Sequence, residues 1–278
     1  ILQKLNSTDR NLIAVEDPIE MEIEGINQIQ VNSDIGLTFA SCLRSILRQD
    51  PDIIMIGEIR DTETAKIAVR ASITGHLVLS TLHTNTSLNT IERLLDMEVE
   101  RYLLASSLTG IISQKLARKL CPTCKKLRAV NNYEKTMFKT VLGIDVNEIP
   151  TTGGCDECNN NGYKGRIAIH EVLQINESIR DAISEGIKKD KLRELVYKSD
   201  VSTLLQDGLE KVRAGLTTME EIVKLIEFED DGAVDGENTS LKDAIAISMN
   251  PTNNNNNKEK EQIMLEDTTI DDIPELLL

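Results

Sequence analysis

The sequence predicts an α/β fold, and two features of residues 49–58 carry that prediction. Pro51 interrupts the chain, because a proline forces the residue before it, here Asp50, out of the helical region. Residues 53–56 (Ile-Ile-Met-Ile) form an unbroken apolar run, which is typical of a strand buried on both faces of a parallel sheet. Glu58 follows closely, and ligands of open α/β sheets bind just beyond the carboxyl ends of the strands.

Two further stretches repeat the arrangement of an apolar run followed by polar side chains. Residues 12–15 precede an acidic pair and a proline, and residues 77–79 precede the sequence Ser-Thr-Leu-His-Thr. The carboxyl ends of parallel strands meet at one edge of a sheet. We therefore expect five of these side chains to gather at one edge: Glu16, Asp17, Glu58, His83 and Thr84.

A carboxylate at such an edge has a defined chemical use. It can orient a water molecule and help to hold Mg²⁺, which is what a nucleotide-hydrolysing site requires. Gly57, directly before Glu58, allows a close approach. The alternative is a buried strand followed by a solvated acid, which is a common arrangement.

Helical patterns separate the three predicted strands. Thr38 begins a helix with apolar residues on one face, on which Cys42 is a small core residue. Asp61 caps a second helix that ends at Gly75. We expect a hairpin-like excursion over residues 21–31. Two more amphipathic helices are expected over residues 87–97 and 101–120, the second with basic residues at its end: Lys115, Arg118 and Lys119.

Composition limits the classes of function. The 278 residues carry a net charge of −15, and from residue 229 onward 13 acids and three lysines give a net of −10. Neither part suggests a nucleic-acid binder, and with 3% aromatic residues and no tryptophan the chain has few stacking platforms. No apolar stretch approaches the ~20 residues of a membrane span.

Four of the five cysteines form two Cys-x-x-Cys pairs: Cys121, Cys124, Cys155 and Cys158. Two such pairs can give four thiolates to one tetrahedral Zn²⁺ site, although the 30 residues between them exceed the usual spacing. The alternative is two disulfides, which the reducing cytosol disfavours. A metal ion bound by four thiolates has no open coordination position, so we expect its role to be structural. Within the 30 residues between the two pairs we expect a short helix over residues 133–142.

Residues 177–227 have the pattern of several helices, and residues 217–221 that of a capping box at the start of the last one. After residue 227 the composition becomes acidic and rich in asparagine, so we expect a disordered tail. Residues 241–249 and 275–278 are candidates for short docking segments within it.

Three motifs and the cysteine tetrad follow one another along the chain. The motifs are the acidic stretch at residues 16–20, the Gly-Glu-Ile-Arg-Asp stretch at 57–61 and the Thr-Leu-His-Thr stretch at 81–84. With them, residues 1–227 resemble the ATPases that drive type II secretion and type IV pilus assembly. The resemblance implies part of a RecA-like P-loop ATPase core at 1–117, a tetracysteine zinc subdomain at 118–170, a helical region at 171–228 and the tail at 229–278.

The resemblance also implies site roles and cofactors, namely ATP, Mg²⁺ and Zn²⁺. Glu58 would orient or polarise the attacking water, and His83 would sense the γ-phosphate. Mg²⁺ and its waters would be supported by Glu16 and Asp17, which compensate for Gly57 at a position where many P-loop ATPases have an aspartate. Further residues of the nucleotide site would be Glu20, Gly57, Arg60 and Thr84.

A phosphate-binding loop requires a Gly-Lys pair, which this sequence lacks, and in the family the loop lies just before the position of Ile1. Because the chain begins with Ile1 rather than Met, we expect a C-terminal piece of a longer protein, inactive alone. The resemblance implies a homo-hexameric cytoplasmic motor at the inner membrane, with a platform protein and a cytoplasmic adaptor as partners. The alternatives are a DNA-uptake pilus motor and a catalytically inactive, zinc-stabilised interaction module.

Overall fold

The computed structural model describes residues 1–198 and 201–227, and the expected tail lies outside them. These residues form two compact units. Unit 1 contains Ile1–Ile111 and Ile175–Leu192, and unit 2 contains Ile112–Gln174 and the described residues from Arg193 onward. The domain boundaries expected at residues 117, 170 and 228 remain predictions. No helix of the described residues is long and apolar enough to cross a membrane.

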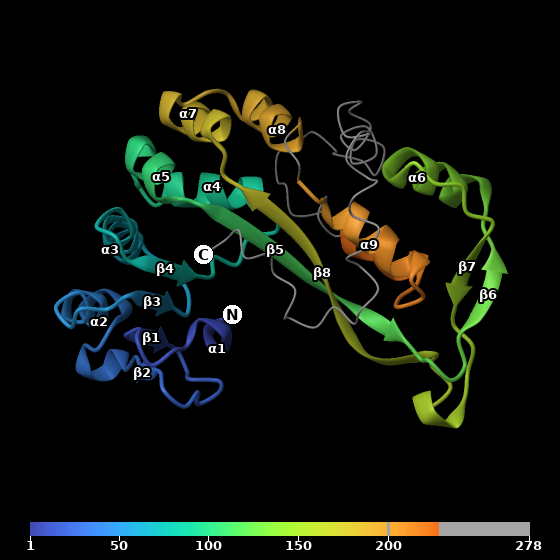
Figure 1. Cartoon of the computed structure of the whole chain (residues 1–278), viewed down its shortest axis with the longest axis horizontal. Coiled ribbons are helices and arrows are strands. Elements are labelled where there is room, and N and C mark those ends of the chain that lie inside the picture. Colours follow the sequence, from blue (N-terminus) through green and yellow to red (C-terminus); the bar gives the residue numbers. More distant parts are fainter. Residues whose placement is uncertain (199–200, 228–278) are drawn as a thin grey trace. The chain divides into compact units, whose positions relative to one another are not determined.

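Unit 1 is built on a parallel sheet with the strand order β2-β1-β3-β4 (Figure 1). These strands are β1 (Leu12–Glu16), β2 (Asn27–Gln30), β3 (Ile53–Ile56) and β4 (Leu77–Ser80). β1 and β3 lie in the middle of the sheet, and all of their residues except two are buried. The predicted α/β class and the three predicted strands are therefore confirmed.

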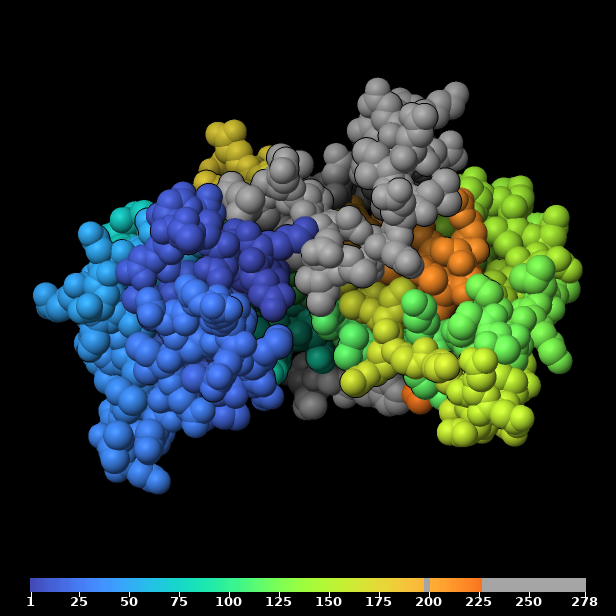
Figure 2. Space-filling view, turned by 60° about the horizontal axis from the view of Figure 1, so that its bottom comes forward, coloured from blue at the N-terminus to red at the C-terminus, as the bar shows by residue number. Residues whose placement is uncertain are grey.

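Helices cover this sheet, and their caps follow the sequence signals. Thr38 caps α2, with its hydroxyl accepting a hydrogen bond from the Ser41 amide, and Asp61 caps α3 through the Thr64 amide. Cys42 is buried, as expected of a core residue. The segments before β3 form one closely packed body (blue in Figure 2). The helices of unit 1 are α1 (Leu2–Leu5), α2 (Phe39–Ile46), α3 (Thr62–Ile73), α4 (Ser87–Asp96), α5 (Arg101–Ser107) and α7 (Glu177–Glu185).

Two predictions of secondary structure are wrong. Residues 21–31 do not form a hairpin, because β2 within them pairs parallel to β1 after the chain has crossed back. The helix expected over residues 101–120 is α5 followed by the strand β5 (Gly110–Leu120). At the start of β5, residues alternate between buried and exposed, which is the two-residue period of a strand. The strand that pairs with it, β8 (Tyr163–Gln174), lies far along the chain.

Unit 2 contains the β5–β8 pair and a second pair of strands, β6 (Lys126–Ala129) and β7 (Glu148–Thr151), which run antiparallel to each other. α6 (Asn132–Leu142) lies between these two strands in the chain, where the sequence predicts a short helix. Its Met137 and Phe138 are buried in one core with residues of α9 (Leu204–Arg213) and α10 (Met219–Glu227). α8 (Lys189–Lys198) precedes α9 in the chain.

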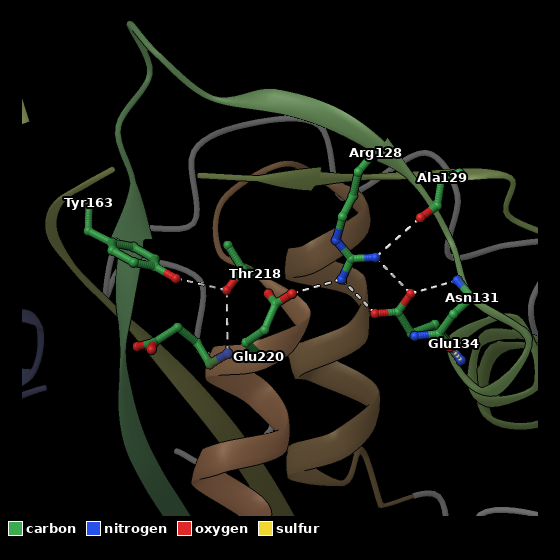
Figure 3. Close-up of polar contacts among 8 residues, drawn as sticks. Arg128, Ala129, Asn131, Glu134, Tyr163, Thr218 and Glu220 are labelled. Carbon is green, nitrogen blue, oxygen red and sulfur yellow. Dashed lines mark hydrogen bonds and ion pairs between the residues drawn. The ribbon is translucent and has the colours of Figure 1, made fainter. Parts of the chain in front are cut away.

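Arg128 on β6 ties three elements of unit 2 together (Figure 3). Its guanidinium donates to both carboxylate oxygens of Glu134 on α6, at 2.8 and 2.6 Å, and to Glu220 on α10 at 2.8 Å. The bonds from Arg128 hold the pKa of the buried Glu134 carboxyl below its usual value. Because a buried carboxylate is costly without partners, this network favours one arrangement of α6 and α10 over others.

The capping box predicted at residues 217–221 is only half formed. The Thr218 hydroxyl accepts a hydrogen bond from the Glu221 amide at 3.4 Å, as the motif requires. The Glu221 carboxylate does not close the box by accepting from the Thr218 amide. It instead accepts hydrogen bonds from the backbone amide and the guanidinium of Arg118 on β5. A charged partner from another element therefore replaces the local bond.

Gly208 offers a test of packing between α9 and α10. Alanine stabilises an ordinary helix interior relative to glycine by about 1 kcal/mol. At this position an added Cβ would lie 2.8 Å from Cγ2 of the buried Ile222. We therefore expect Gly208→Ala to destabilise the chain by about 1–3 kcal/mol in urea unfolding. In an Ile222→Ala background the same change should stabilise, and a stabilising effect of Gly208→Ala alone would refute the close contact.

Candidate functional site

The carboxyl ends of β1, β3 and β4 lie side by side, and hydrogen bonds join the chain segments beyond them. The Gly57 amide donates to the Val15 carbonyl at 2.7 Å, and the Ile59 amide donates to the Thr81 carbonyl at 3.0 Å. The Thr81 hydroxyl donates to the Gly57 carbonyl at 2.6 Å. These bonds hold the residues on either side of Glu58, so the sheet sets the direction in which its side chain leaves the backbone.

Residue 57 must be a glycine because the backbone of β1 leaves no room for a side chain there. A Cβ at this position would lie 3.2 Å from the Val15 carbonyl oxygen and 3.3 Å from Cα of Glu16. Both contacts are tighter than ordinary van der Waals distances, and both involve backbone atoms that cannot easily move. The close approach predicted at Gly57 is therefore made by the end of β1, which brings Glu16 next to the segment that carries Glu58.

Glu58 is buried except for about a tenth of its side chain, and it has two partners at this edge. Its Oε2 accepts a hydrogen bond from Nε of Arg60 at 2.5 Å and lies 3.3 Å from Nε2 of His83. The bond from Arg60 holds the pKa of Glu58 below its usual value, against the opposing effect of burial. The carboxylate is therefore ionised at neutral pH and is suited to orient and polarise a water molecule.

His83 stands in a strained backbone conformation, since its φ of +33° lies in the left-handed region that non-glycine residues rarely adopt. Most of its side chain is exposed. The next residue, Thr84, shares a hydroxyl–hydroxyl hydrogen bond of 2.6 Å with Thr90 on α4. These residues border an open hollow of about 380 Å³ that is lined by Glu58, Ile59, Arg60, Leu82, His83, Thr84 and Arg93.

The three acids at the end of β1 and beyond it differ in how far they are exposed. Glu16 is half-buried and accepts a hydrogen bond from the Gln28 side-chain amide at 2.7 Å. Asp17 is exposed, and the pKa of Arg60 is raised mainly by its hydrogen bond to Glu58 and to a smaller extent by the charge of Asp17. Glu20 is also exposed, in the connection between β1 and β2, and does not line the hollow.

The hollow therefore brings together Glu58, Arg60, His83 and Thr84 of the predicted residues. Sequence reasoning missed Arg93, which enters from α4, and Gln28, the partner of Glu16 on β2. The sequence does offer a clue to Arg93: it lies three residues after Thr90, and residues three apart lie on the same side of a helix. Gln28 offers no comparable signal, since only the parallel pairing of β2 with β1 puts it beside Glu16.

The four predicted cysteines gather in unit 2, with all their Sγ atoms within 4.8 Å of one another. The Sγ–Sγ distances are 3.8 Å for Cys121–Cys155 and 3.7 Å for both Cys124–Cys158 and Cys155–Cys158. Four ligands at ~2.3 Å from a tetrahedral Zn²⁺ would stand ~3.8 Å apart. Donor atoms and spacing therefore fit a closed site for a thiolate-bound metal ion.

Glycines shape the loops around this cysteine cluster. A Cβ at Gly153 would lie 2.0 Å from the Cys124 carbonyl oxygen, so no other residue fits there without moving the first cysteine pair. Gly162 has a φ of +79°, and its amide donates to Sγ of Cys158 at 3.2 Å. The segment that carries the second pair lies at the surface (yellow-green in Figure 2).

Residues 1–224 match the family model described as type II/IV secretion system protein. The chain is 48% identical over 228 residues to type II secretion system protein E of Dickeya dadantii, covering 82% of this chain and 45% of that relative. It is 47% identical over 227 residues to the type IV pilus assembly ATPase PilB of Myxococcus xanthus, covering 80% and 40%. The chain thus spans less than half of each relative.

Solved structures agree with the sequence relatives. The pilus retraction motor PilT, crystallised with bound ADP, superposes with a TM-score of 0.58 at 31% identity, over 81% of this chain and 55% of that one. The Legionella pneumophila ATPase DotB superposes with a TM-score of 0.56 at 25% identity, over 84% and 55%. Since the family model covers most of the chain, the protein belongs to the type II/IV secretion system protein family.

Proposed function

We propose that this chain supplies the water-activating half of an ATP hydrolysis site, in a motor ATPase that powers pilin or pseudopilin assembly. The observation that carries the proposal is the ionised Glu58, held beside His83 in an open hollow at the carboxyl ends of a parallel sheet. The printed names of the relatives, secretion protein E and pilus assembly ATPase, support the same reaction.

In this proposal Glu58 orients the attacking water and polarises it. Its lowered pKa makes it a weak proton acceptor, so its contribution is mainly electrostatic and positional, as is usual in phosphoryl transfer. Arg60 keeps Glu58 ionised and fixes its carboxylate. A change in the Arg60 bond would alter the direction in which the water is held.

Mg²⁺ would be held near the end of β1, where the carboxylates supply the oxygen ligands that this ion prefers. Glu16 has one oxygen bonded to Gln28, and Asp17 is exposed. Glu20 would act through ordered water. Mg²⁺ would bridge phosphate oxygens and neutralise their charge.

His83 would contact the γ-phosphate and thereby report whether ATP or ADP is bound. Its side chain is exposed at the hollow while its imidazole touches Glu58, so one side chain links the phosphate to the water-orienting acid. Thr84 would support this loop through its bond to α4, and Gly57 through its close packing against β1.

The phosphate-binding loop would come from residues outside these 278, completing a RecA-like core. We further propose a homo-hexamer that works at the cytoplasmic side of the inner membrane, through a platform protein and a cytoplasmic adaptor, without binding nucleic acid. Hexameric assembly would supply the remaining cationic residues of each site from a neighbouring subunit.

In unit 2 we propose a structural Zn²⁺ bound by the four cysteines. The sulfur spacing supports tetrahedral coordination, and four thiolates leave no position for a substrate. The ion would cross-link two segments that are 30 residues apart in the chain and so stabilise unit 2 directly.

Glu58→Gln tests the proposed reaction. The change keeps the shape and reach of the side chain but removes the charge that polarises water. In the intact ATPase that carries these residues, we expect ATP turnover to fall about 100-fold or more, with little change in ATP affinity. Turnover and nucleotide binding should be measured together. Turnover at the wild-type rate would show that Glu58 has no part in hydrolysis, and an inactive wild type would favour the interaction module.

His83→Ala separates phosphate sensing from hydrolysis. Because the proposed partner of His83 is the γ-phosphate, the variant should retain part of its turnover but discriminate less between ATP and ADP. The ratio of the two dissociation constants, measured by calorimetry with a slowly hydrolysed ATP analogue, reports this directly. His76→Ala is a matched control, because His76 instead hydrogen-bonds the Ala71 carbonyl at 2.9 Å. An unchanged ratio in His83→Ala would contradict the sensing role.

The metal proposal predicts one zinc per chain in protein purified under reducing conditions. Cys124→Ser or Cys155→Ser should lower that content and destabilise unit 2, because structural zinc contributes folding energy directly. Elemental analysis and urea unfolding measure the two effects, and Cys42→Ala, outside the cluster, is the control for zinc content. Well under one zinc per chain in the wild type would rule the site out.

A further inference from the structure

Glu16, at the end of β1, is held by an uncharged side chain. Its Oε1 accepts a hydrogen bond from Nε2 of Gln28 on β2 at 2.7 Å. Among the described residues, no lysine or arginine forms an ion pair with Glu16, and no hydrogen bond reaches its Oε2. The contact with Gln28 therefore fixes one carboxylate oxygen of Glu16 and adds no positive charge beside it.

The parallel pairing of β1 with β2 brings Gln28 to this place. Gln28 lies opposite Ala14 in the register of the two strands, and Glu16 follows Ala14 by two residues. Residues two apart in a strand share one face of the sheet. Because Ala14 is small, the longer side chain of Gln28 can extend along β1 as far as the Glu16 carboxylate.

The Gln28 amide group is itself fixed by the connection between β1 and β2. Its Oε1 accepts a hydrogen bond from the Ile23 amide at 2.7 Å, and its Nε2 also donates to the Met21 carbonyl at 3.0 Å. Only the nitrogen of a glutamine amide can donate, so these backbone partners determine which end of the group faces Glu16. The side chain cannot turn its N–H away from Glu16 without losing the bond from Ile23.

The fixed carboxylate belongs to a side chain that lies beside the segment leading to Glu58. Cγ of Glu16 is 3.8 Å from the position that a Cβ on Gly57 would occupy. Mg²⁺ prefers oxygen ligands and requires nearly ideal octahedral geometry, so a carboxylate with a fixed direction suits it. Partners that orient the ligands of a metal ion typically change its affinity 10–100-fold. A lysine or arginine in place of Gln28 would instead compete with the ion for the same carboxylate.

We infer that Gln28 is a positioning residue for Mg²⁺, which acts by fixing Glu16 so that its second carboxylate oxygen can bind the ion. Because Gln28 is uncharged, it orients Glu16 without competing with the cation. This inference rests on the proposed function, in which Glu16 supports Mg²⁺, and adds to it a residue from β2. Gln28 acts only through Glu16.

The test uses the intact ATPase that carries these residues, with the variants Gln28→Met and Gln28→Lys and the matched control Gln30→Met. Gln30 lies on the same strand, is exposed, and accepts a hydrogen bond from the Ile19 amide at 3.3 Å without bonding Glu16. Mn²⁺ serves as the probe in place of Mg²⁺, and its dissociation constant in the presence of ADP is measured by electron paramagnetic resonance. The Mg²⁺ dependence of kcat and the unfolding midpoint are measured on the same samples.

Gln28→Met should weaken Mn²⁺ binding about tenfold or more, the scale on which partners of metal ligands act. Its kcat should recover toward the wild-type value as Mg²⁺ is raised, because Glu16 itself remains. Gln28→Lys should weaken Mn²⁺ binding at least as much, since its positive charge opposes the ion although its ammonium group can still donate to Glu16. Gln30→Met should match the wild type in Mn²⁺ binding.

Both Gln28 variants lose the bond from the Ile23 amide, so a disturbed connection between β1 and β2 would affect them alike. Tighter Mn²⁺ binding in Gln28→Lys than in Gln28→Met would show that only a hydrogen-bond donor is needed and would overturn the inference. Wild-type Mn²⁺ affinity in both variants would also overturn it. If Glu16→Gln weakens Mn²⁺ binding in that case, the metal role proposed for Glu16 stands. If Glu16→Gln also leaves Mn²⁺ binding unchanged, that role fails as well.

Discussion

The candidate site depends on the hydrogen-bonded ladder of β1, β3 and β4, which continues past the ends of the strands. Backbone bonds from Gly57 to Val15 and from Ile59 to Thr81 hold the chain on both sides of Glu58. This continuation is possible because residue 57 has no side chain, since a Cβ would press against the backbone of β1. The position of Glu58 is therefore a property of the sheet and not of its own loop.

Electrostatics at this edge are set by a pairing that keeps Glu58 charged. The hydrogen bond from Arg60 outweighs the burial of the carboxylate, so the pKa of Glu58 stays below its usual value. A carboxylate with a low pKa is a poor proton acceptor but can orient a water molecule effectively. The hollow beside it contains a second arginine and an imidazole, which together make the space favourable for an anion.

Unit 2 is stabilised by polar contacts between elements far apart in the chain, in addition to its apolar core. Arg128 joins β6, α6 and α10, and Arg118 on β5 pairs with Glu221 while stacking over the Tyr163 ring at 4.0 Å. The Tyr163 hydroxyl in turn shares a hydrogen bond with Thr218 at 3.0 Å (Figure 3). The cysteine cluster lies in the same unit, so a metal ion there would add to a framework that is already connected.

Local signals in the sequence determined the strands before Glu58 and His83, the caps at Thr38 and Asp61, and the identity of the four cysteines. Each depends on neighbours within a few residues, through apolar periodicity, capping chemistry or Cys-x-x-Cys spacing. Tertiary structure alone decided that β5 is a strand, because its partner β8 lies more than 40 residues away in the chain. It also decided that the Glu221 carboxylate accepts from Arg118 and does not complete a capping box, and that Arg93 lines the same hollow as Glu58. In these cases the deciding partner is distant in the chain, and a pattern read along the sequence contains no information about which distant residue will supply it.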